Sequence, residues 1–249
     1  MKTVIIIPAR FQSSRFPGKP LTPILGKPMI LWVAEICAKA LPIKFVYIAT
    51  DDLRIKEVVE AAGFNVVMTS KKALTGTDRI ADAANQIDAD IYINVQGDEP
   101  LLNPNDILSI IDTKKKYPNE VINGYCKIND NESPESLNIP KVVFNENNQM
   151  LYMSRHLIPG SKSKQIKPSH YFKQVCIYAF NKNELLDFVN FGRKGTLEFY
   201  EDIEILRFLD IGTKIRVLET NNASLAVDIP EDVSRVEEEI IRQRNNIEE

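Results

Sequence analysis

Strand and helix patterns alternate through the first 115 residues. Short apolar, β-branched runs end abruptly in polar residues, and most are followed by segments with apolar side chains at helical spacing. The predicted strands are residues 3–7, 44–50, 64–69 and 91–95, and the predicted helices are residues 28–40, 53–62 and 77–86. Strands buried on both faces and separated by helices are typical of a parallel sheet. This part of the sequence therefore predicts a doubly wound, Rossmann-like α/β sheet.

After Tyr117 the pattern changes. Shorter β-like runs at residues 141–144 and 171–180 are joined by polar loops. A helical stretch at residues 197–209, a strand at 214–219 and a last helix from Pro230 follow. We interpret residues 1–249 as one domain, in which residues of about 120–212 form a smaller mixed α+β lobe within or beside the sheet.

Composition narrows the class of protein. The chain has 31 basic and 34 acidic residues, a net charge of −3, which gives no electrostatic reason to expect a nucleic-acid partner. The apolar run Val4–Ile7 is too short for a membrane span or a signal sequence. Three widely separated cysteines and two isolated histidines predict neither a disulfide framework nor a zinc site. We expect a cytoplasmic protein.

The loop after the first predicted strand carries three cations, Arg10, Arg15 and Lys19, among small residues and prolines. In an open α/β sheet, ligands bind beyond the carboxyl ends of the strands. Guanidinium and ammonium groups at such an edge suit a polyphosphate. The loop has neither the G-x-x-x-x-G-K-[ST] nor the G-x-G-x-x-G pattern, and the alternative is a solvated basic loop.

Carboxylates follow two apolar runs. Asp98 and Glu99 follow the predicted strand 91–95 after Gln96 and Gly97, and Asp228 follows the strand-like run Ser224–Val227. A doubly wound sheet would bring the carboxyl ends of such strands to a common edge. Carboxylate oxygens are the ligands that Mg²⁺ prefers. The alternative for each site is a helix cap, because a helical segment follows soon after. Two such sites together favour a metal more than either does alone.

Six segments, in this order, carry a resemblance to a known family: IPARFQSSRFPGKPL, TGTDRIA, NVQGDEPL, LYMSRHLIP, LEFYEDIEILR and VDIPEDVSRVE. They resemble the 3-deoxy-manno-octulosonate cytidylyltransferases, or CMP-Kdo synthetases, and the likeness runs from Val4 to about Glu238. The R-x-x-S-x-R-x-P-G-K loop is shared with other CMP-sugar-acid synthetases, whereas the NVQGDEP block narrows the resemblance to the Kdo branch.

The resemblance implies that CTP and a 3-deoxy-2-ulosonic acid give a CMP-sugar acid and pyrophosphate, for lipopolysaccharide or surface polysaccharide synthesis. It implies a Mg²⁺ cofactor, a homodimer, and a sugar-binding and dimerising role for the lobe. Arg10, Arg15 and Lys19 would hold the triphosphate, and Asp98 and Asp228 would bind the metal. Lys19, Arg10 and Asp98 would be the catalytic residues. The remaining implied contacts are Ala9, Thr77 and Arg79 to the nucleoside, and Gln96, Arg155, Gln174, Tyr178 and Glu204 to the sugar acid.

Several of these residues have a plainer interpretation. Arg79 could be the exposed cation of an amphipathic helix, Arg155 part of a surface ion pair, and Tyr178 a packing residue. Glu204 could pair with Arg207 at i, i+3. An apolar stripe could supply the dimer contact or could pack on its own sheet; its members are Leu197, Ile203, Leu206 and Leu209.

The chain also departs from the family pattern. Ala73 replaces a usual histidine, Gln174-Val175-Cys176 replaces His-Ile-Gly, and Ile205 replaces a glutamine. By analogy the last two sites lie near the sugar, so an amino-substituted Kdo is a credible substrate, although ordinary Kdo ranks first. The sequence is also compatible with a synthetase for sialic, legionaminic or pseudaminic-type acids, and with a non-catalytic nucleotide-binding relative.

Overall fold

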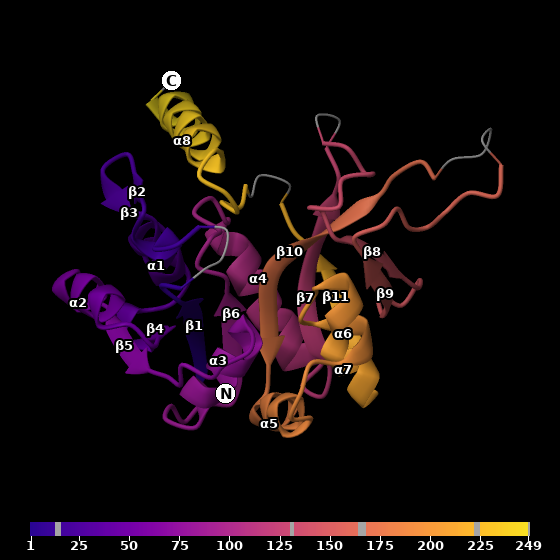
Figure 1. Ribbon diagram of the computed structural model, residues 1–249, viewed down its shortest axis with the longest axis horizontal. Coiled ribbons are helices and arrows are strands. Elements are labelled where there is room, and N and C mark those ends of the chain that lie inside the picture. The colour runs from indigo at the N-terminus through magenta and orange to yellow at the C-terminus, as the bar shows by residue number, and fades with distance from the viewer. Residues whose placement is uncertain (13–15, 130–131, 164–167, 222–224, 249) are drawn as a thin grey trace.

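A mixed sheet forms the centre of the molecule (Figure 1). The computed structural model describes residues 1–12, 16–129, 132–163, 168–221 and 225–248. The strands follow one another in the order β11-β7-β10-β6-β1-β4-β5, and β8 and β9 are attached beside β10. Their bounds are β1 (Thr3–Ala9), β4 (Val46–Thr50), β5 (Asn65–Met68), β6 (Ile91–Val95), β7 (Val121–Lys127), β8 (Lys141–Phe144), β9 (Met150–Ser154), β10 (Phe172–Phe180) and β11 (Ile215–Glu219).

Strand direction in the sheet is mostly parallel, as predicted. Strands β1, β4, β5 and β6 pair in parallel, and so do β7 and β11. Strand β10 is antiparallel to both of its neighbours, β6 and β7. Because it runs the opposite way, β10 begins at the edge where β6 and β7 end. The first residues of β10 therefore lie beside the loops that follow the parallel strands.

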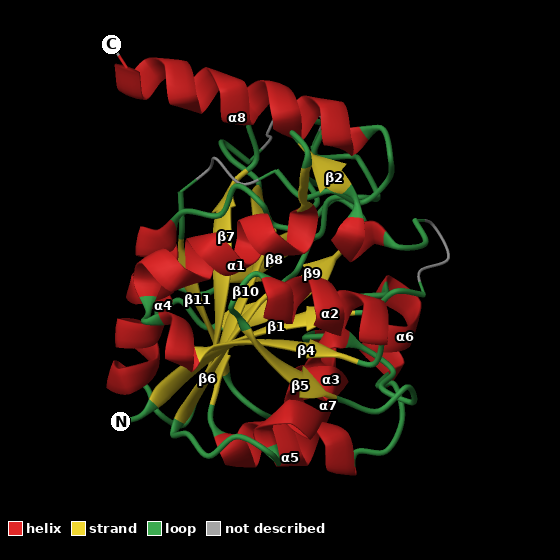
Figure 2. Cartoon of the chain, turned by 90° about the vertical axis from the view of Figure 1, so that its left-hand side faces the viewer, coloured by secondary structure: helices red, strands yellow, loops and turns green. Residues whose placement is uncertain are grey.

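Helices cover both faces of this sheet (Figure 2). On one face lie α1 (Met29–Ala40), α2 (Leu53–Ala61) and α4 (Pro104–Lys116), which share a hydrophobic core with β1 and β6. On the other lie α3 (Gly76–Ala84), α5 (Lys182–Asn190), α6 (Thr196–Glu201) and α7 (Leu206–Ile211). Among the described residues, no helix is long and apolar enough to cross a membrane.

The last helix, α8 (Asp232–Glu248), lies away from the sheet, beside the hairpin of β2 (Pro23–Ile24) and β3 (Lys27–Pro28). Val236 and Ile240 of α8 pack against Ile24 and Met29, and Val227 joins the same small cluster. The segment before α8 is thereby anchored close to the loop that follows β1.

The prediction for β1 stopped two residues early. The strand continues through Pro8 to Ala9, and its parallel pairing with β4 extends as far as Ala9. Pairing with β6 ends at Ile6, so the missing N–H of Pro8 interrupts no ladder on that side.

The predicted helix at 197–209 is in fact two short helices, α6 and α7. Asp202 has left-handed backbone angles (φ 51°, ψ 46°), which end α6. Aspartate tolerates this conformation better than most residues do. The break leaves a short connection between the helices, residues 202–205, that contains Glu204.

A buried ion pair joins α4 to α5. The Lys114 ammonium lies 2.6 Å from Glu184 Oε2 and also donates to the carbonyl of Glu120. Both side chains are almost fully buried. Burial lowers the pKa of Lys114 and raises that of Glu184, and the attraction between the two charges opposes each shift.

We predict that Lys114→Met lowers the free energy of unfolding by about 3–5 kcal/mol, because Glu184 is left buried without its cation. The raised pKa means that folded Glu184 holds its proton at pH values where the unfolded chain releases it. The loss should therefore be smaller near pH 5 than at pH 8. Chemical denaturation at both pH values measures this. Lys115→Met, which alters an exposed lysine, is the control. An equal loss at both pH values would show that Glu184 does not carry the effect.

Candidate active site

A backbone hydrogen bond just before Lys19 closes the loop that follows β1. The Gly18 N–H donates to the carbonyl of Phe11 at 2.8 Å, and Gly18 has a φ of 75°. A side chain at position 18 would meet the Phe11 ring. Only glycine adopts this turn without strain. Lys19 then begins a short 3₁₀ helix, Lys19–Leu21.

Lys19 lies between the two carboxylates expected to bind a metal. Its ammonium is 2.7 Å from Asp98 Oδ2 and 3.9 Å from Asp228 Oδ1, and it donates to the carbonyl of Val227 at 2.8 Å. The structure thus brings together residues that are 79 and 208 positions apart in sequence. Three oxygen atoms surround one cation.

The helix-cap alternative is wrong for both carboxylates. Helix α4 begins at Pro104 and is capped by Asn103, whose side chain accepts from the Asn105 N–H. Helix α8 begins at Asp232, four residues after Asp228, and Asp232 itself accepts from the Asp228 and Ile229 N–H groups.

The reason for their convergence differs from the prediction, however. Residues 225–228 form no strand of the sheet. Instead, the Val227 N–H donates to the carbonyl of Asp98 at 3.0 Å, which ties this segment to the loop after β6.

The donor set suits a hard cation, because carboxylate and carbonyl oxygens are the usual ligands of Mg²⁺. The Lys19 ammonium shows that these oxygens can surround a positive charge. Among the described residues, no group of three or more His, Cys, Asp or Glu side chains could hold a metal. A metal at this point would need further oxygens from a ligand or from water.

The first turn of α3 carries the residues expected near the nucleoside. Thr75 caps the helix in a reciprocal arrangement with Asp78. Arg79 is buried and donates to Thr69 Oγ1 at 2.6 Å, and it lies 3.5 Å from Asp51 Oδ1. Burial lowers the pKa of Arg79, and Asp51 opposes that shift. The alternative of an exposed helical cation is therefore wrong.

Glu204 connects α3 to the loop after β6. Its carboxylate accepts from the Thr77 N–H at 3.1 Å and from Gln96 Nε2 at 3.0 Å. Burial raises the pKa of Glu204, while bonds from Thr77 and Thr75 act against the shift. The alternative role of Glu204, an ion pair with Arg207, is wrong, because Arg207 binds Asp78 and Glu198 instead. The structure thus joins Thr77, predicted for the nucleoside, to Gln96 and Glu204, predicted for the sugar acid.

Gln174, Cys176 and Tyr178 follow one another on β10. Gln174 Nε2 donates to the Tyr178 hydroxyl at 3.0 Å, and the Gln96 N–H donates to the Cys176 carbonyl at 3.2 Å. Burial raises the pKa of Cys176 and of Tyr178, and the nearby charges of Glu99 and Glu204 raise both further. Through Gln96, this stretch of β10 is connected to the carboxylate of Glu204.

Two of the other predicted residues lie at the end of β1, and Arg155 lies beside α6. Ala9 is buried at the end of β1, and Arg10, which follows it, is exposed. Arg15 lies outside the described residues. Arg155 makes no surface ion pair among the described residues; its guanidinium donates to the carbonyls of Glu201, Asp202 and Leu137. It is thereby attached to the end of α6, near the connection that carries Glu204.

Ile205 does not line an open pocket. Its side chain is 1% exposed and belongs to the hydrophobic core. Ile203 and Leu206 of the proposed dimer stripe are buried in the same core, and Leu197 and Leu209 pack against it. The stripe therefore packs within its own chain. The exposed large apolar side chains of α6 are Phe199 and Tyr200.

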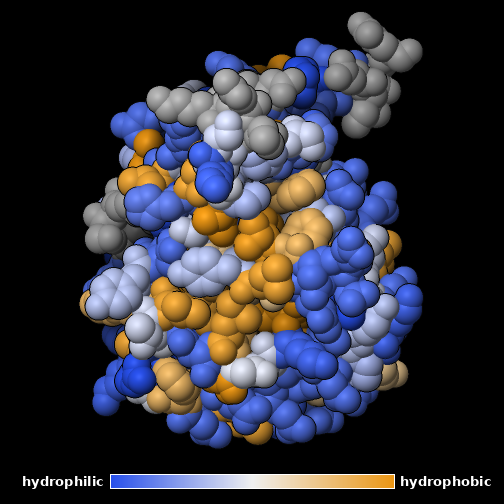
Figure 3. Space-filling model, turned by 90° about the vertical axis from the view of Figure 1, so that its right-hand side faces the viewer, coloured by the Kyte–Doolittle hydropathy of each residue, from blue (hydrophilic) through white to orange (hydrophobic). Residues whose placement is uncertain are grey.

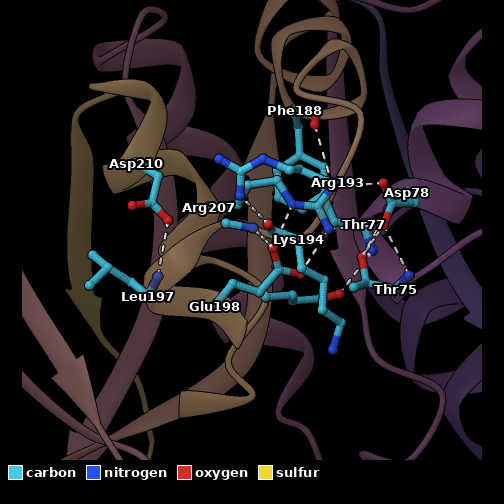
Figure 4. Close-up of polar contacts among 12 residues, drawn as sticks. Thr75, Thr77, Asp78, Phe188, Arg193, Lys194, Leu197, Glu198, Arg207 and Asp210 are labelled. Atoms are coloured by element: carbon cyan, nitrogen blue, oxygen red, sulfur yellow. Dashed lines mark hydrogen bonds and ion pairs between the residues drawn. The ribbon is translucent and has the colours of Figure 1, made fainter. Parts of the chain in front are cut away.

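Sequence analysis missed the role of Arg207. The structure buries its guanidinium between Asp78 of α3 and Glu198 of α6 (Figure 4). The signal was available, because Arg207 is a charged residue between the apolar residues Leu206 and Phe208. Its two partners, 129 and 9 positions away, could not be read from spacing.

Comparisons with known proteins agree on one family. Residues 4–215 match the family model described as cytidylyltransferase. An 8-amino-3,8-dideoxy-manno-octulosonate cytidylyltransferase of Shewanella baltica (strain OS185) is 42% identical over 96% of this chain and 99% of its own length. The corresponding protein of Shewanella oneidensis is 41% identical over the same shares.

Solved structures give the same result. A CMP:2-keto-3-deoxy-manno-octonic acid synthetase complexed with CTP superposes with a TM-score of 0.89 at 35% identity, over 98% of this chain and all of that one. A cytidylyltransferase from Leptospira borgpetersenii, at 18% identity and a TM-score of 0.63 over 95% of this chain and 85% of that one, shares the fold. Cytidylyltransferases of this kind generally use a divalent metal ion. The chain belongs to the cytidylyltransferase family and is a nucleotidyltransferase of its 3-deoxy-manno-octulosonate, or Kdo, type.

Proposed function

We propose that this enzyme transfers CMP from CTP to 8-amino-3,8-dideoxy-manno-octulosonate and releases pyrophosphate, in the cytoplasm. The sugar named for the Shewanella relatives supports the amino-substituted acid over ordinary Kdo. The structural observation that supports the choice is the position of the Glu204 carboxylate, which accepts from the Gln96 side chain, while the Gln96 backbone N–H donates to Cys176 of β10.

An 8-amino group is an ammonium at neutral pH, so it differs from the 8-hydroxyl of Kdo mainly by its positive charge. Neighbouring carboxylates favour such a cation, whereas an imidazole that can take a proton repels it. The family's usual histidine is replaced here by Gln174, a neutral side chain that offers a carbonyl oxygen as an acceptor. Both features favour the amine.

In the proposed reaction, the 2-hydroxyl of the sugar acid attacks the α-phosphorus of CTP. An oxygen–phosphorus bond forms, the bond between the α- and β-phosphates breaks, and the hydroxyl proton is lost. Such transfers depend on positioning and on neutralising charge, so no histidine is required. Thr77 and Arg79 hold the nucleoside side, and Gln96 and Glu204 hold the sugar side.

Asp98 and Asp228 hold the metal, which we take to be Mg²⁺. When bound, Mg²⁺ supplies positive charge to the phosphates and a template for the reacting oxygens. A metal held by Asp98 and Asp228 would compete with the Lys19 ammonium, which lies 2.7 Å from Asp98 Oδ2. The freed ammonium can then bind the phosphates together with Arg10, which is exposed at the end of β1.

Removal of either metal carboxylate should abolish most of the activity. We predict that Asp98→Asn and Asp228→Asn each lower kcat by at least about two orders of magnitude, on the order of 3 kcal/mol of transition-state stabilisation. EDTA should stop the wild-type reaction, and Mg²⁺ should restore it. Pyrophosphate release measures kcat, and Asp187→Asn, which alters an exposed acid of α5, is the control. A lowered melting temperature with unchanged kcat would make Asp228 a structural residue.

The preference of the enzyme for one sugar acid over another should depend on the charge of the group at position 8 of the sugar. With CTP held constant, we predict that kcat/KM is about tenfold higher for the 8-amino acid than for Kdo. Gln174→His should remove this preference, more at pH 6 than at pH 8, because the imidazole is protonated at the lower pH. The KM for CTP should hardly change. Gln86→His, beyond the end of α3, is the matched control. Equal turnover of both sugars by the wild type would reject the amino substrate, and turnover of neither would reject the proposed function.

We also propose a homodimer. Phe199 and Tyr200 of α6 are 67% and 82% exposed, and Leu151 of β9 is 59% exposed. Figure 3 shows apolar side chains gathered on this side of the molecule. Exposed apolar surface of this kind marks an interaction site, and a second copy of the same chain is the partner that the family resemblance implies.

We predict that Phe199→Asp shifts the mass measured by light scattering from two chains to one. A charge at the centre of an apolar interface cannot be paired when the interface forms. Leu53→Asp, which alters an exposed leucine of α2, should leave the mass unchanged. A wild-type mass of one chain at micromolar concentration would contradict the homodimer.

A further inference from the structure

Arg207 is a deeply buried arginine that contacts α3. Its side chain is 1% exposed and stacks on the Phe188 ring, with its guanidinium carbon 3.8 Å from the ring centre. Nε and Nη2 donate to the two oxygens of Glu198 at 2.6 and 2.7 Å. Nη1 and Nη2 donate to the two oxygens of Asp78 at 2.8 and 3.2 Å. One guanidinium thus binds two carboxylates, each through both of its oxygens (Figure 4).

Both of these carboxylates organise the beginning of a helix. Asp78 accepts from the N–H and the hydroxyl of Thr75, the residue that caps α3. Glu198 accepts from the Gly195 N–H at the start of α6. A carboxylate at this third helical position fixes the first turn by satisfying a free backbone N–H. Arg207 therefore connects the first turn of α3 to the first turn of α6.

The connection reaches the groups proposed to bind the substrates. The first turn of α3 presents the Thr77 N–H to Glu204, and Glu204 also accepts from Gln96. Glu204 is three residues before Arg207, and its carbonyl accepts from the Arg207 N–H at 3.1 Å. A shift of α6 and α7 against α3 would break the Thr77–Glu204 bond and displace Gln96.

We propose that Arg207 is a positioning residue that aligns the nucleoside side of the site, on α3, with the sugar side, at Glu204 and Gln96. It touches neither reacting group. Its two bidentate ion pairs fix the distance and the angle between the first turns of α3 and α6. A lysine could not do this, because its ammonium is a point charge on a flexible stem. This inference rests on the proposed function for the roles of Thr77, Gln96 and Glu204.

The alignment matters because the two substrates must meet in line at the α-phosphorus. A displacement of about 1 Å between reacting groups can cost up to two orders of magnitude in rate. Each half of the site would still bind its own substrate if Arg207 lost one partner. The expected signature is therefore a fall in kcat with little change in the affinity for CTP.

Glu198→Gln is the test variant, because Glu198 makes no hydrogen bond or ion pair with α3 among the described residues. We expect kcat to fall about tenfold, while the Kd for CTP, measured by calorimetry, changes less than about threefold. Asp78→Asn should lower kcat similarly. The double variant should be little worse than either single one, because both act through the same guanidinium.

A second readout does not depend on turnover. Hydrogen exchange of residues 75–79 should accelerate in Glu198→Gln, although that variant alters a residue 120 positions or more from Thr75, Thr77 and Asp78. Glu184→Gln is the matched control: Glu184 also occupies the third position of a capped helix, α5, and also pairs with a buried cation, Lys114. It should leave both kcat and exchange at residues 75–79 as in the wild type.

Two results would overturn the inference. One is a lowered melting temperature in Glu198→Gln with wild-type kcat and wild-type exchange at residues 75–79, which would make Arg207 purely structural. The other is a weakening of CTP binding as large as the fall in kcat. Absence of turnover in the wild type would reject the proposed function instead, and the exchange experiment would still decide whether Arg207 aligns α3 with α6.

Discussion

The Lys19 ammonium holds together three segments that come from distant parts of the chain. It contacts Asp98 after β6, the carbonyl of Val227, and Asp228 before α8. Two carboxylates at such an edge would repel each other without a cation between them. Any ligand that binds Lys19 more strongly than Asp98 does also changes what those carboxylates can hold. The proposed binding of phosphate and of metal at this edge would therefore be coupled through one side chain.

Two buried cations, Arg79 and Arg207, are likewise paired with carboxylates at places where α3 meets neighbouring segments. Arg79 ties α3 to the loops after β4 and β5 through Asp51 and Thr69. Arg207 ties α3 to α6. A buried ion pair adds little net stability compared with apolar packing, but breaking one is costly. What such pairs supply is a defined geometry, and here they converge on the first turn of α3, which faces Glu204.

The sequence could predict the parts of this fold that depend on local pattern. The parallel strands of the first half and the helices between them follow from the alternation of apolar runs and amphipathic segments. The sequence could not predict the break at Asp202, because a left-handed residue inside a helical pattern depends on the tertiary contacts of Glu204 and Arg207. It also suggested a wrong reason for the placement of Asp228, whose segment is held by a backbone bond to Asp98 and by the packing of α8.

Resemblance to a family predicted the reaction, but residue identity alone could not place every side chain. Ile205 replaces a residue expected near the sugar, yet it is buried in the core, so its apolar character is explained by packing. Gln174 replaces a histidine on β10, and there the structure shows a polar contact with Tyr178. The two departures therefore differ in kind. Under the proposed function, the departure on β10 would change the charge that a bound sugar meets, and a family of enzymes that share one reaction can differ in substrate through a change of that kind.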